Sequence, residues 1–196
     1  MRRFFAVLLP LALSGCDQPP TKEISAAEAQ IEQAREAGAE RFVPDRWREA
    51  QAALVTARAK VQEKDYRAAL SAANDAAEKG RLATQGVATA KAHAVRAAEL
   101  AQREIGIFME EIEQVRQEAL VAKIPDEAFL EVEPRLTEVR EGLQRVADTL
   151  AKGDVLEAQK AAAELRAQAT DLPAAFRDAR ALWEEEHPKG RKPARR

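Results

Sequence analysis

One uninterrupted stretch decides the fold of this chain, residues 69–122: ALSAANDAAEKGRLATQGVATAKAHAVRAAELAQREIGIFMEEIEQVRQEALVA. Small or apolar residues recur in it at alternating steps of three and four, which keeps them on one side of a helix. No proline interrupts the stretch, so it predicts one long helix of about 80 Å at roughly 1.5 Å per residue. The predicted seam consists of Ala69, Ala73, Ala76, Gly80, Ala83, Val87, Ala90, Ala94, Ala97 and Ala101 and, after a one-residue slip, Ile105, Phe108, Ile112, Val115, Ala119 and Ala122.

The first half of this seam is built mainly of alanine and the second half of bulkier side chains. Neighbouring helices should therefore approach the long helix more closely at one end than at the other. Gly80 and Gly86 lie in the first half. Each should weaken the long helix locally by roughly 1 kcal/mol, which would permit a bend there.

Shorter helices are predicted before the long one. The first covers about residues 24–37. Ser25 and Glu28 have the spacing of a capping box, and Gly38 is suited to end the helix. Pro44 is placed to open a second helix, because proline is favoured in the first turn.

The chain repeats part of this pattern after the long helix, which Pro125 and Pro134 should end. The turn Lys64-Asp65-Tyr66, where Asp65 is suited to cap the long helix, has a counterpart at Gly153-Asp154-Val155. A shift of 89 residues thus relates two predicted helical hairpins, although any two alanine-rich amphipathic hairpins would align to some extent. The shift pairs Leu54 with Leu143, Ala57 with Val146, Val61 with Leu150, Asp65 with Asp154, Ala69 with Ala158 and Ala73 with Ala162.

The composition agrees with a helical protein. Charged residues make up 33% of the chain and aromatic residues only 5%, a balance that is typical of long helices and coiled coils. A final helix is predicted over residues 173–186, with Phe176 and Trp183. The sequence therefore predicts an all-α fold of elongated antiparallel helical hairpins, joined by one long central helix, with coiled-coil-like packing. The formal net charge of −2 argues against a nucleic-acid partner, which would require a basic face.

The N-terminus carries a signal for location. Arg2-Arg3 precedes an apolar run over residues 4–13, which is half of the roughly 20 residues that span a bilayer. The tetrad Leu13-Ser14-Gly15-Cys16 resembles the lipobox of bacterial lipoproteins. The resemblance implies that residues 1–15 are a signal peptide and that Cys16 is lipidated and becomes the mature N-terminus. A plain secretory signal with a chance cysteine is the alternative.

The lipobox resemblance also implies an organisation in the bacterial envelope, with the chain facing the periplasm. Residues 16–23 would form the lipidated cysteine and a tether, residues 24–122 the first hairpin and the long helix, and residues 123–186 the second hairpin and the final helix. Asp17 follows the anchor, where in enteric bacteria an aspartate resembles a signal against transport to the outer membrane. This favours the inner membrane. Cys16 is the only cysteine, so no disulfide forms within the chain.

Part of the chain also resembles a helical lipoprotein family. Residues between 24 and 82 are similar to the signature of the bacterial family called domain of unknown function 4398, which implies a cysteine-anchored, periplasm-facing domain of unassigned activity. The turn at Asp65-Tyr66 is similar to the inter-helix turn of tetratricopeptide repeats as well. The long helix and the missing 34-residue period depart from that pattern. The matching residues are Ala34, Ala37-Gly38-Ala39, Pro44, Ala50, Leu54, Ala57, Asp65-Tyr66 and Ala69.

No spacing of residues in the chain indicates chemistry. His93 and His187 have no second histidine or cysteine at ligand spacing, whereas a zinc site needs three or four converging ligands. The carboxylate runs Glu110-Glu111-Glu113 and Glu184-Glu185-Glu186 are typical of solvated helix faces with salt bridges. We therefore expect no catalytic residue, no metal site, no cofactor and no enzymatic activity.

Residues 187–196 hold five basic side chains and two prolines, a composition typical of a disordered tail. Such a tail either contacts anionic lipid head groups or an acidic partner, or only keeps the chain soluble.

Taken together, the sequence predicts a non-enzymatic envelope lipoprotein, attached to the membrane through Cys16, that acts as a scaffold, spacer or tether for an unknown envelope protein. The alternative is a tetratricopeptide-like module whose groove binds a peptide or protein. Large apolar or aromatic side chains lining the groove would favour recognition. A charged exterior with every large residue buried would favour the spacer.

Overall fold

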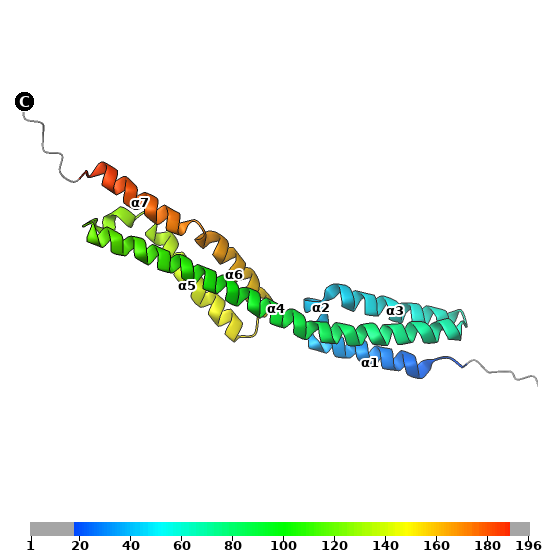
Figure 1. Cartoon of the computed structure of the whole chain (residues 1–196). Coiled ribbons are helices and arrows are strands. Elements are labelled where there is room, and N and C mark those ends of the chain that lie inside the picture. The colour runs from blue at the N-terminus through cyan, green and yellow to red at the C-terminus, as the bar shows by residue number, and fades with distance from the viewer. Residues whose placement is uncertain (1–17, 189–196) are drawn as a thin grey trace, which may run out of the picture. The chain divides into compact units, whose positions relative to one another are not determined.

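The computed structural model describes residues 18–188, and the helices among them are shown in Figure 1. These residues contain no β-strand, so the predicted all-α fold is confirmed. The predicted long helix is α4, with 56 residues. The elements follow one another as α1 (Thr21–Ala37), α2 (Ala39–Phe42), α3 (Pro44–Gln62), α4 (Tyr66–Val121), the 3₁₀ turn η1 (Asp126–Phe129), α5 (Glu133–Ala151), α6 (Val155–Ala169) and α7 (Leu172–Glu186).

The chain forms two compact units, and α4 contributes to both of them. The N-terminal unit is Met1–Ala88 and the C-terminal unit is Thr89–Arg196. The N-terminal unit therefore uses α1, α2, α3 and the first part of α4, whereas the C-terminal unit uses the rest of α4 with η1, α5, α6 and α7. The predicted division after residue 122 lies next to the end of α4 at Val121, whereas the compact units divide inside this helix.

The core of the N-terminal unit is made largely of alanine. Ala27 and Ile31 of α1 pack with Ala50 and Leu54 of α3 and with Ala76 of α4. A second cluster lies further along and contains Ala34, Ala39, Ala83 and Val87, with Trp47 packed against it. Such small side chains let helix backbones approach closely.

Gly80 of α4 lies against the backbone of α1. A Cβ atom at Gly80 would be 3.0 Å from the backbone carbon of Gln30, a distance that real Cβ atoms rarely show. The helix continues through this glycine and through Gly86. Gly80 therefore makes room for the backbone of α1, a role that the periodicity of α4 alone does not reveal.

The C-terminal unit has a core of larger side chains. Ile105 and Ile112 of α4 pack with Leu136 of α5 and with Phe176 of α7 in one cluster. The rings of Phe129 in η1 and Phe176 stack with their centroids 5.4 Å apart. The predicted change along α4 from alanine to bulkier seam residues is thus a change of core between the two units.

The shift of 89 residues relates the two units in structure as well as in sequence. Helices α3 and α5 have 19 residues each, and their first residues are 89 positions apart. After α3, the N–H of Lys64 donates to the carbonyl of Val61 at 3.0 Å, and after α5 that of Gly153 donates to Leu150 at 2.9 Å. Both Lys64 (φ 59°) and Gly153 (φ 83°) have the left-handed backbone conformation. The two turns, 89 residues apart, therefore have the same kind of backbone conformation.

Several predicted helix boundaries are confirmed, and one is wrong. Gly38 ends α1 in the left-handed conformation, and Pro44 opens α3. Asp65 caps α4, because its Oδ1 accepts a hydrogen bond from the N–H of Ala68 at 3.0 Å. The predicted capping box is wrong because α1 begins at Thr21, so Ser25 and Glu28 lie inside the helix. Glu28 instead accepts a hydrogen bond from Arg58 of α3 at 2.7 Å.

Most of the predicted seam of α4 is buried, although Ala90, Phe108 and Ala122 are only half-buried, and one step of it is displaced. Ala98 is fully buried, whereas the predicted seam residue Ala97 is only half-buried. The one-residue slip therefore falls between Ala94 and Ala98 and not after Ala101. It lies close to Thr89, where α4 passes from the first unit to the second and its packing partners change.

Candidate functional surfaces

The predicted lipidation site cannot be placed on the fold. Cys16 and the lipobox lie outside the described residues, as does the basic tail from Lys189 onward. Within residues 18–188, no helix combines the length and the apolar character that crossing a membrane requires. The lipid anchor and the tail therefore stay predictions.

The two histidines occupy different surroundings. His93 lies on the exposed side of α4, as expected for a solvated residue. His187 is exposed but stacks on Trp183, with 4.1 Å between the ring centroids and 15° between the planes. Its Nδ1 lies 3.1 Å from the carbonyl oxygen of Trp183. Across the described part of the chain, no three His, Cys, Asp or Glu side chains are grouped so that they could hold a metal ion.

Three glutamates of α4 form the most regular polar feature of the C-terminal unit. Glu104, Glu111 and Glu118 are seven residues apart, so they lie along one side of the helix. Their partners are arginines of α6 and α7. Arg166 donates to Glu104 at 2.8 Å, Arg177 donates to Glu111 at 3.4 Å, and Arg180 pairs with Glu118. We call these pairs the ion-pair row.

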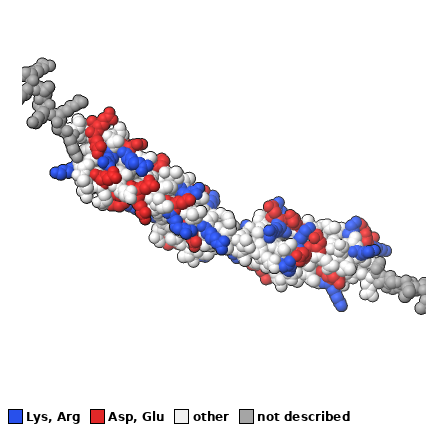
Figure 2. Space-filling view, viewed as in Figure 1, with Lys and Arg blue, Asp and Glu red and all other residues white. Residues whose placement is uncertain are grey.

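The ion-pair row attaches α6 and α7 to α4. The pKa of the Arg180 guanidinium is raised, and its hydrogen bond to Glu118 is the largest cause. Arg180 also contacts Glu184 at 3.3 Å. Figure 2 shows acidic and basic side chains interspersed over the visible face of this unit. The spacing of the glutamates is readable in the sequence, but the arginines lie 62 to 66 residues away and could not be assigned from it.

A cleft of about 410 Å³ lies between α4 and α7. Most of its lining is charged or polar, and only Val115 and Ala181 are apolar. Val115 is itself buried in the core. The lining residues are Glu111, Gln114, Val115, Glu118, Arg177, Arg180, Ala181 and Glu184. The cleft thus lacks the large apolar side chains that were expected of a recognition groove.

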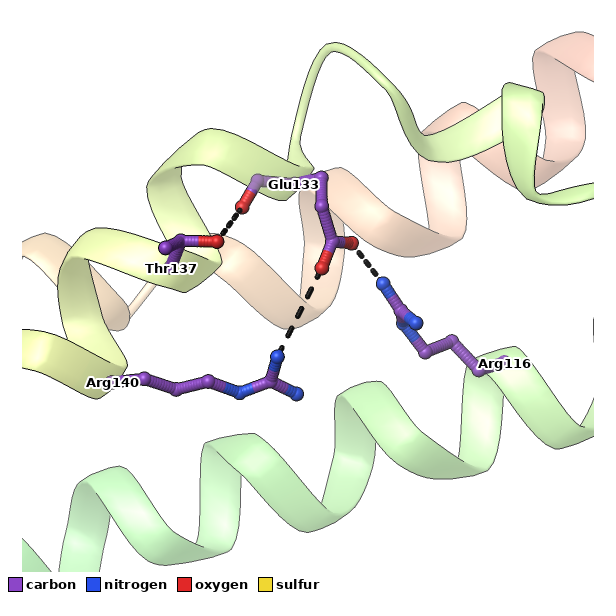
Figure 3. A network of polar contacts seen from close by, with 4 residues as sticks. All are labelled: Arg116, Glu133, Thr137 and Arg140. Carbon is purple, nitrogen blue, oxygen red and sulfur yellow. Dashed lines mark hydrogen bonds and ion pairs between the residues drawn. The ribbon is translucent and has the colours of Figure 1, made fainter.

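A second polar cluster lies at the start of α5 (Figure 3). The Glu133 carboxylate pairs with Arg116 of α4 and lies 3.9 Å from Arg140, while the Thr137 hydroxyl donates to the Glu133 carbonyl at 3.1 Å. The dipole of α5 favours a carboxylate at this position. The Arg116 guanidinium also lies 5.5 Å from the ring centroid of Phe176. This cluster connects α4, α5 and α7, so we interpret it as a structural contact between these helices.

Large apolar side chains are nevertheless exposed where α4 ends. Leu120 is 69% exposed and Val121 is 84% exposed. Val121 also borders a hollow of about 470 Å³, together with Ala122 and with Arg180 of α7. The expectation for a spacer, that every large residue is buried, therefore does not hold at this end of the C-terminal unit.

Comparison with known proteins adds no assignment. No family model matches this chain, and no curated protein or solved structure is significantly similar to it. The resemblances to the lipobox and to the family of domain of unknown function 4398 therefore stay predictions.

Proposed function

We propose that this protein is a lipoprotein of the bacterial envelope, anchored through Cys16, which acts as a non-enzymatic scaffold, spacer or tether facing the periplasm. The observation that carries the proposal is that α4, a single helix of 56 residues, belongs to both compact units. A helix shared in this way suits a protein that holds surfaces at set positions. Asp17 favours the inner membrane, and the partner would be another envelope protein rather than nucleic acid.

The surface of the C-terminal unit supports this proposal. Its arginines Arg166, Arg177 and Arg180 are used to hold helices to one another. Exposed ion pairs of this kind are worth only about 0–1 kcal/mol each, so their value lies in fixing how α6 and α7 lie on α4. The alternative, a tetratricopeptide-like binding module, ranks second because the cleft between α4 and α7 is charged.

The anchor is tested by Cys16→Ser in the native host. The thiol that would accept the diacylglyceryl group is removed, so a labelled fatty acid should no longer be incorporated and an uncleaved precursor should accumulate. The lipobox assignment would be contradicted if the Cys16→Ser variant were still labelled and still cut before residue 16.

The tether is tested by photo-crosslinking in the same cells. A photoreactive residue replaces Val55 in the N-terminal unit or Leu130 in the C-terminal unit, both of which are strongly exposed. We expect envelope proteins to be captured from both positions. Val95→Pro, which breaks α4 at a cost of about 3 kcal/mol, should change the captured set, and Val95→Ala should not. An unchanged set in Val95→Pro would contradict a function that depends on the intact helix.

A further inference from the structure

The side of α4 that faces away from the core of the C-terminal unit carries exposed apolar side chains. Ile105 belongs to the core, and Ile107, two residues or about 200° further round the helix, lies on the opposite side. Ile107 is 54% exposed, and Leu100, seven residues earlier, is 51% exposed. They belong to a set of exposed residues at alternating steps of four and three, which we call the outer stripe. Its members are Arg96, Leu100, Arg103, Ile107, Glu110 and Gln114.

The steps of the outer stripe are those of a helix that packs against another helix. An alternation of three and four residues keeps a stripe facing a partner over several turns. On its other side, α4 packs on α5 and α7 through Ile105 and Ile112. The outer stripe has this periodicity but no packing partner in the part of the chain that the structure describes, since all six of its residues are exposed.

Among residues 18–188, the charges of the outer stripe have no partners of opposite charge, unlike the glutamates of the ion-pair row on the same helix. Arg103 donates to the backbone carbonyl of Glu99 at 3.4 Å. No carboxylate of the described chain lies at ion-pair distance from Arg96 or Arg103, and no basic group of it lies at that distance from Glu110. The three charges have a fixed order, with both arginines before Ile107 and the glutamate after it.

This order of charges makes the outer stripe complementary to its own reverse. A two-fold axis close to Ile107 would bring Ile107 of two copies together. It would also place Arg103 of each copy beside Glu110 of the other, because these residues lie four before and three after Ile107. A parallel copy would instead oppose Arg103 with Arg103 and Glu110 with Glu110, and like charges that face each other are unfavourable.

We propose that a second copy of this chain packs on the outer stripe of α4, antiparallel to it, with a two-fold axis close to Ile107. Leu100 and Ile107 are then shielded from water, and two Arg103–Glu110 ion pairs form at the edges of the contact. Because the apolar part of the stripe is short, the pairing should be reversible and should depend on protein concentration. This inference goes beyond the proposed function, and the pairing uses no residue of the lipid anchor.

The first experiment measures the mass of the assembly. The protein is purified from its own host in mild detergent and studied by sedimentation equilibrium from micromolar to hundreds of micromolar concentrations. We expect the mass to rise with concentration from that of one chain, 21.6 kDa for the full sequence, to that of two. A protein that stays monomeric over this range overturns the proposal.

Charge reversal tests the direction of the pairing. Arg103→Glu should weaken the dimer about tenfold or more, because two attractive contacts become repulsive at once, and Glu110→Arg should do the same. The chain that carries both changes should pair within about threefold of the unchanged protein, since opposite charges again face each other. Glu138→Arg, at an exposed position of α5, is the control and should have no effect. A double reversal that pairs as weakly as the single ones overturns the proposal.

Replacement of the central residue tests the apolar contact. Ile107→Gln should weaken the dimer about tenfold or more, because two buried isoleucines are lost. Val55→Gln, at a similarly exposed position in the N-terminal unit, should have no effect. Equal pairing by these two variants overturns the proposal. Circular dichroism checks that every variant is folded, and the exposed positions make a folding defect unexpected.

Disulfide formation in cells reports the direction independently. Arg103→Cys in one copy and Glu110→Cys in a differently tagged copy should form a disulfide, because a disulfide requires Cα atoms about 4.4–6.8 Å apart. Arg103→Cys alone should form far less, since its two copies lie on opposite sides of the two-fold axis. The parent chain without an introduced cysteine is the control for Cys16. If Arg103→Cys alone crosslinks as fully as the mixture, the pairing is parallel and the proposal is overturned.

Discussion

The two units share a hairpin related by the shift of 89 residues but fill their cores differently. The N-terminal unit packs α1, α3 and α4 through residues such as Ala27, Ala50 and Ala76, whereas the C-terminal unit uses Ile105 and Phe176. A core of small side chains is packed by the close approach of helix backbones, whereas a core of large side chains is packed by the side chains that fill the space between the helices. Because apolar area governs hydrophobic stabilisation, we expect the N-terminal unit to be the less stable of the two.

Equivalent positions make this comparison measurable. Under the shift of 89 residues, Val87 corresponds to Phe176, and both are buried. Each unit also holds one tryptophan packed against its core, Trp47 in the first and Trp183 in the second. With one of them replaced by phenylalanine, fluorescence reports on the unit that retains its tryptophan. Urea titration then gives the free energy of unfolding for that unit.

The largest expected effect is at this buried pair. Phe176→Ala should lower the free energy of unfolding of the C-terminal unit by about 3–5 kcal/mol, because it leaves a cavity and removes the stack with Phe129. Val87→Ala should cost the N-terminal unit about 2 kcal/mol, since only two methyl-sized groups are lost. Urea titration followed by Trp183 and Trp47 fluorescence measures the two effects. Equal losses would show that core volume does not distinguish the units.

The next effect concerns the close approach of α1 to α4. Gly80→Ala adds a Cβ atom where only 3.0 Å is free, so overpacking of about 1–3 kcal/mol should exceed the gain of about 1 kcal/mol in helix propensity. The melting temperature from circular dichroism should therefore fall. Gly106→Ala, on a part of α4 where a Cβ atom would meet nothing within 4 Å, should raise it. A rise in both variants would mean that α1 can move away from Gly80 without loss.

Gly80 also shows which kind of feature could not be predicted from the sequence. The seam of α4, the stop at Gly38 and the hairpin shift were predictable, because helical periodicity and turn chemistry are local properties. The glycine was interpreted as a weak point of its own helix, because the backbone of Gln30 that crowds it lies 50 residues earlier in the chain. The slip at Ala98 was misplaced for a similar reason, since burial there depends on which helices surround α4.

The candidate surfaces were predictable to a smaller extent. The spacing of Glu104, Glu111 and Glu118 is a pattern in the sequence, but the arginines that pair with them come from helices far along the chain. The exposure of Leu120 and Val121 was not predictable, because a seam of small and large residues does not reveal how α4 ends. Cys16 stays a prediction from sequence, because it lies outside the described residues.

The smallest expected effect compares the two equivalent turns. Lys64 and Gly153 both have positive φ, a conformation that costs a residue with a side chain roughly 1–2 kcal/mol and glycine almost nothing. Gly153→Lys should therefore destabilise the C-terminal unit by about 1 kcal/mol, and this is a backbone effect because a Cβ atom there would meet nothing within 4 Å.

The reverse change tests the same cause in the N-terminal unit. Lys64→Gly should stabilise it by about 0.5–1 kcal/mol, because relief of the backbone strain exceeds the entropy that an extra glycine adds to the unfolded chain. Lys64→Ala keeps the strain and removes the exposed side chain beyond Cβ with its charge, so it should leave the free energy of unfolding almost unchanged. Urea titration with Trp47 fluorescence measures both variants. If Lys64→Gly and Lys64→Ala destabilise the unit equally, the ammonium group of Lys64 and not its backbone decides the stability of this turn, and the two turns are alike in geometry but not in energy.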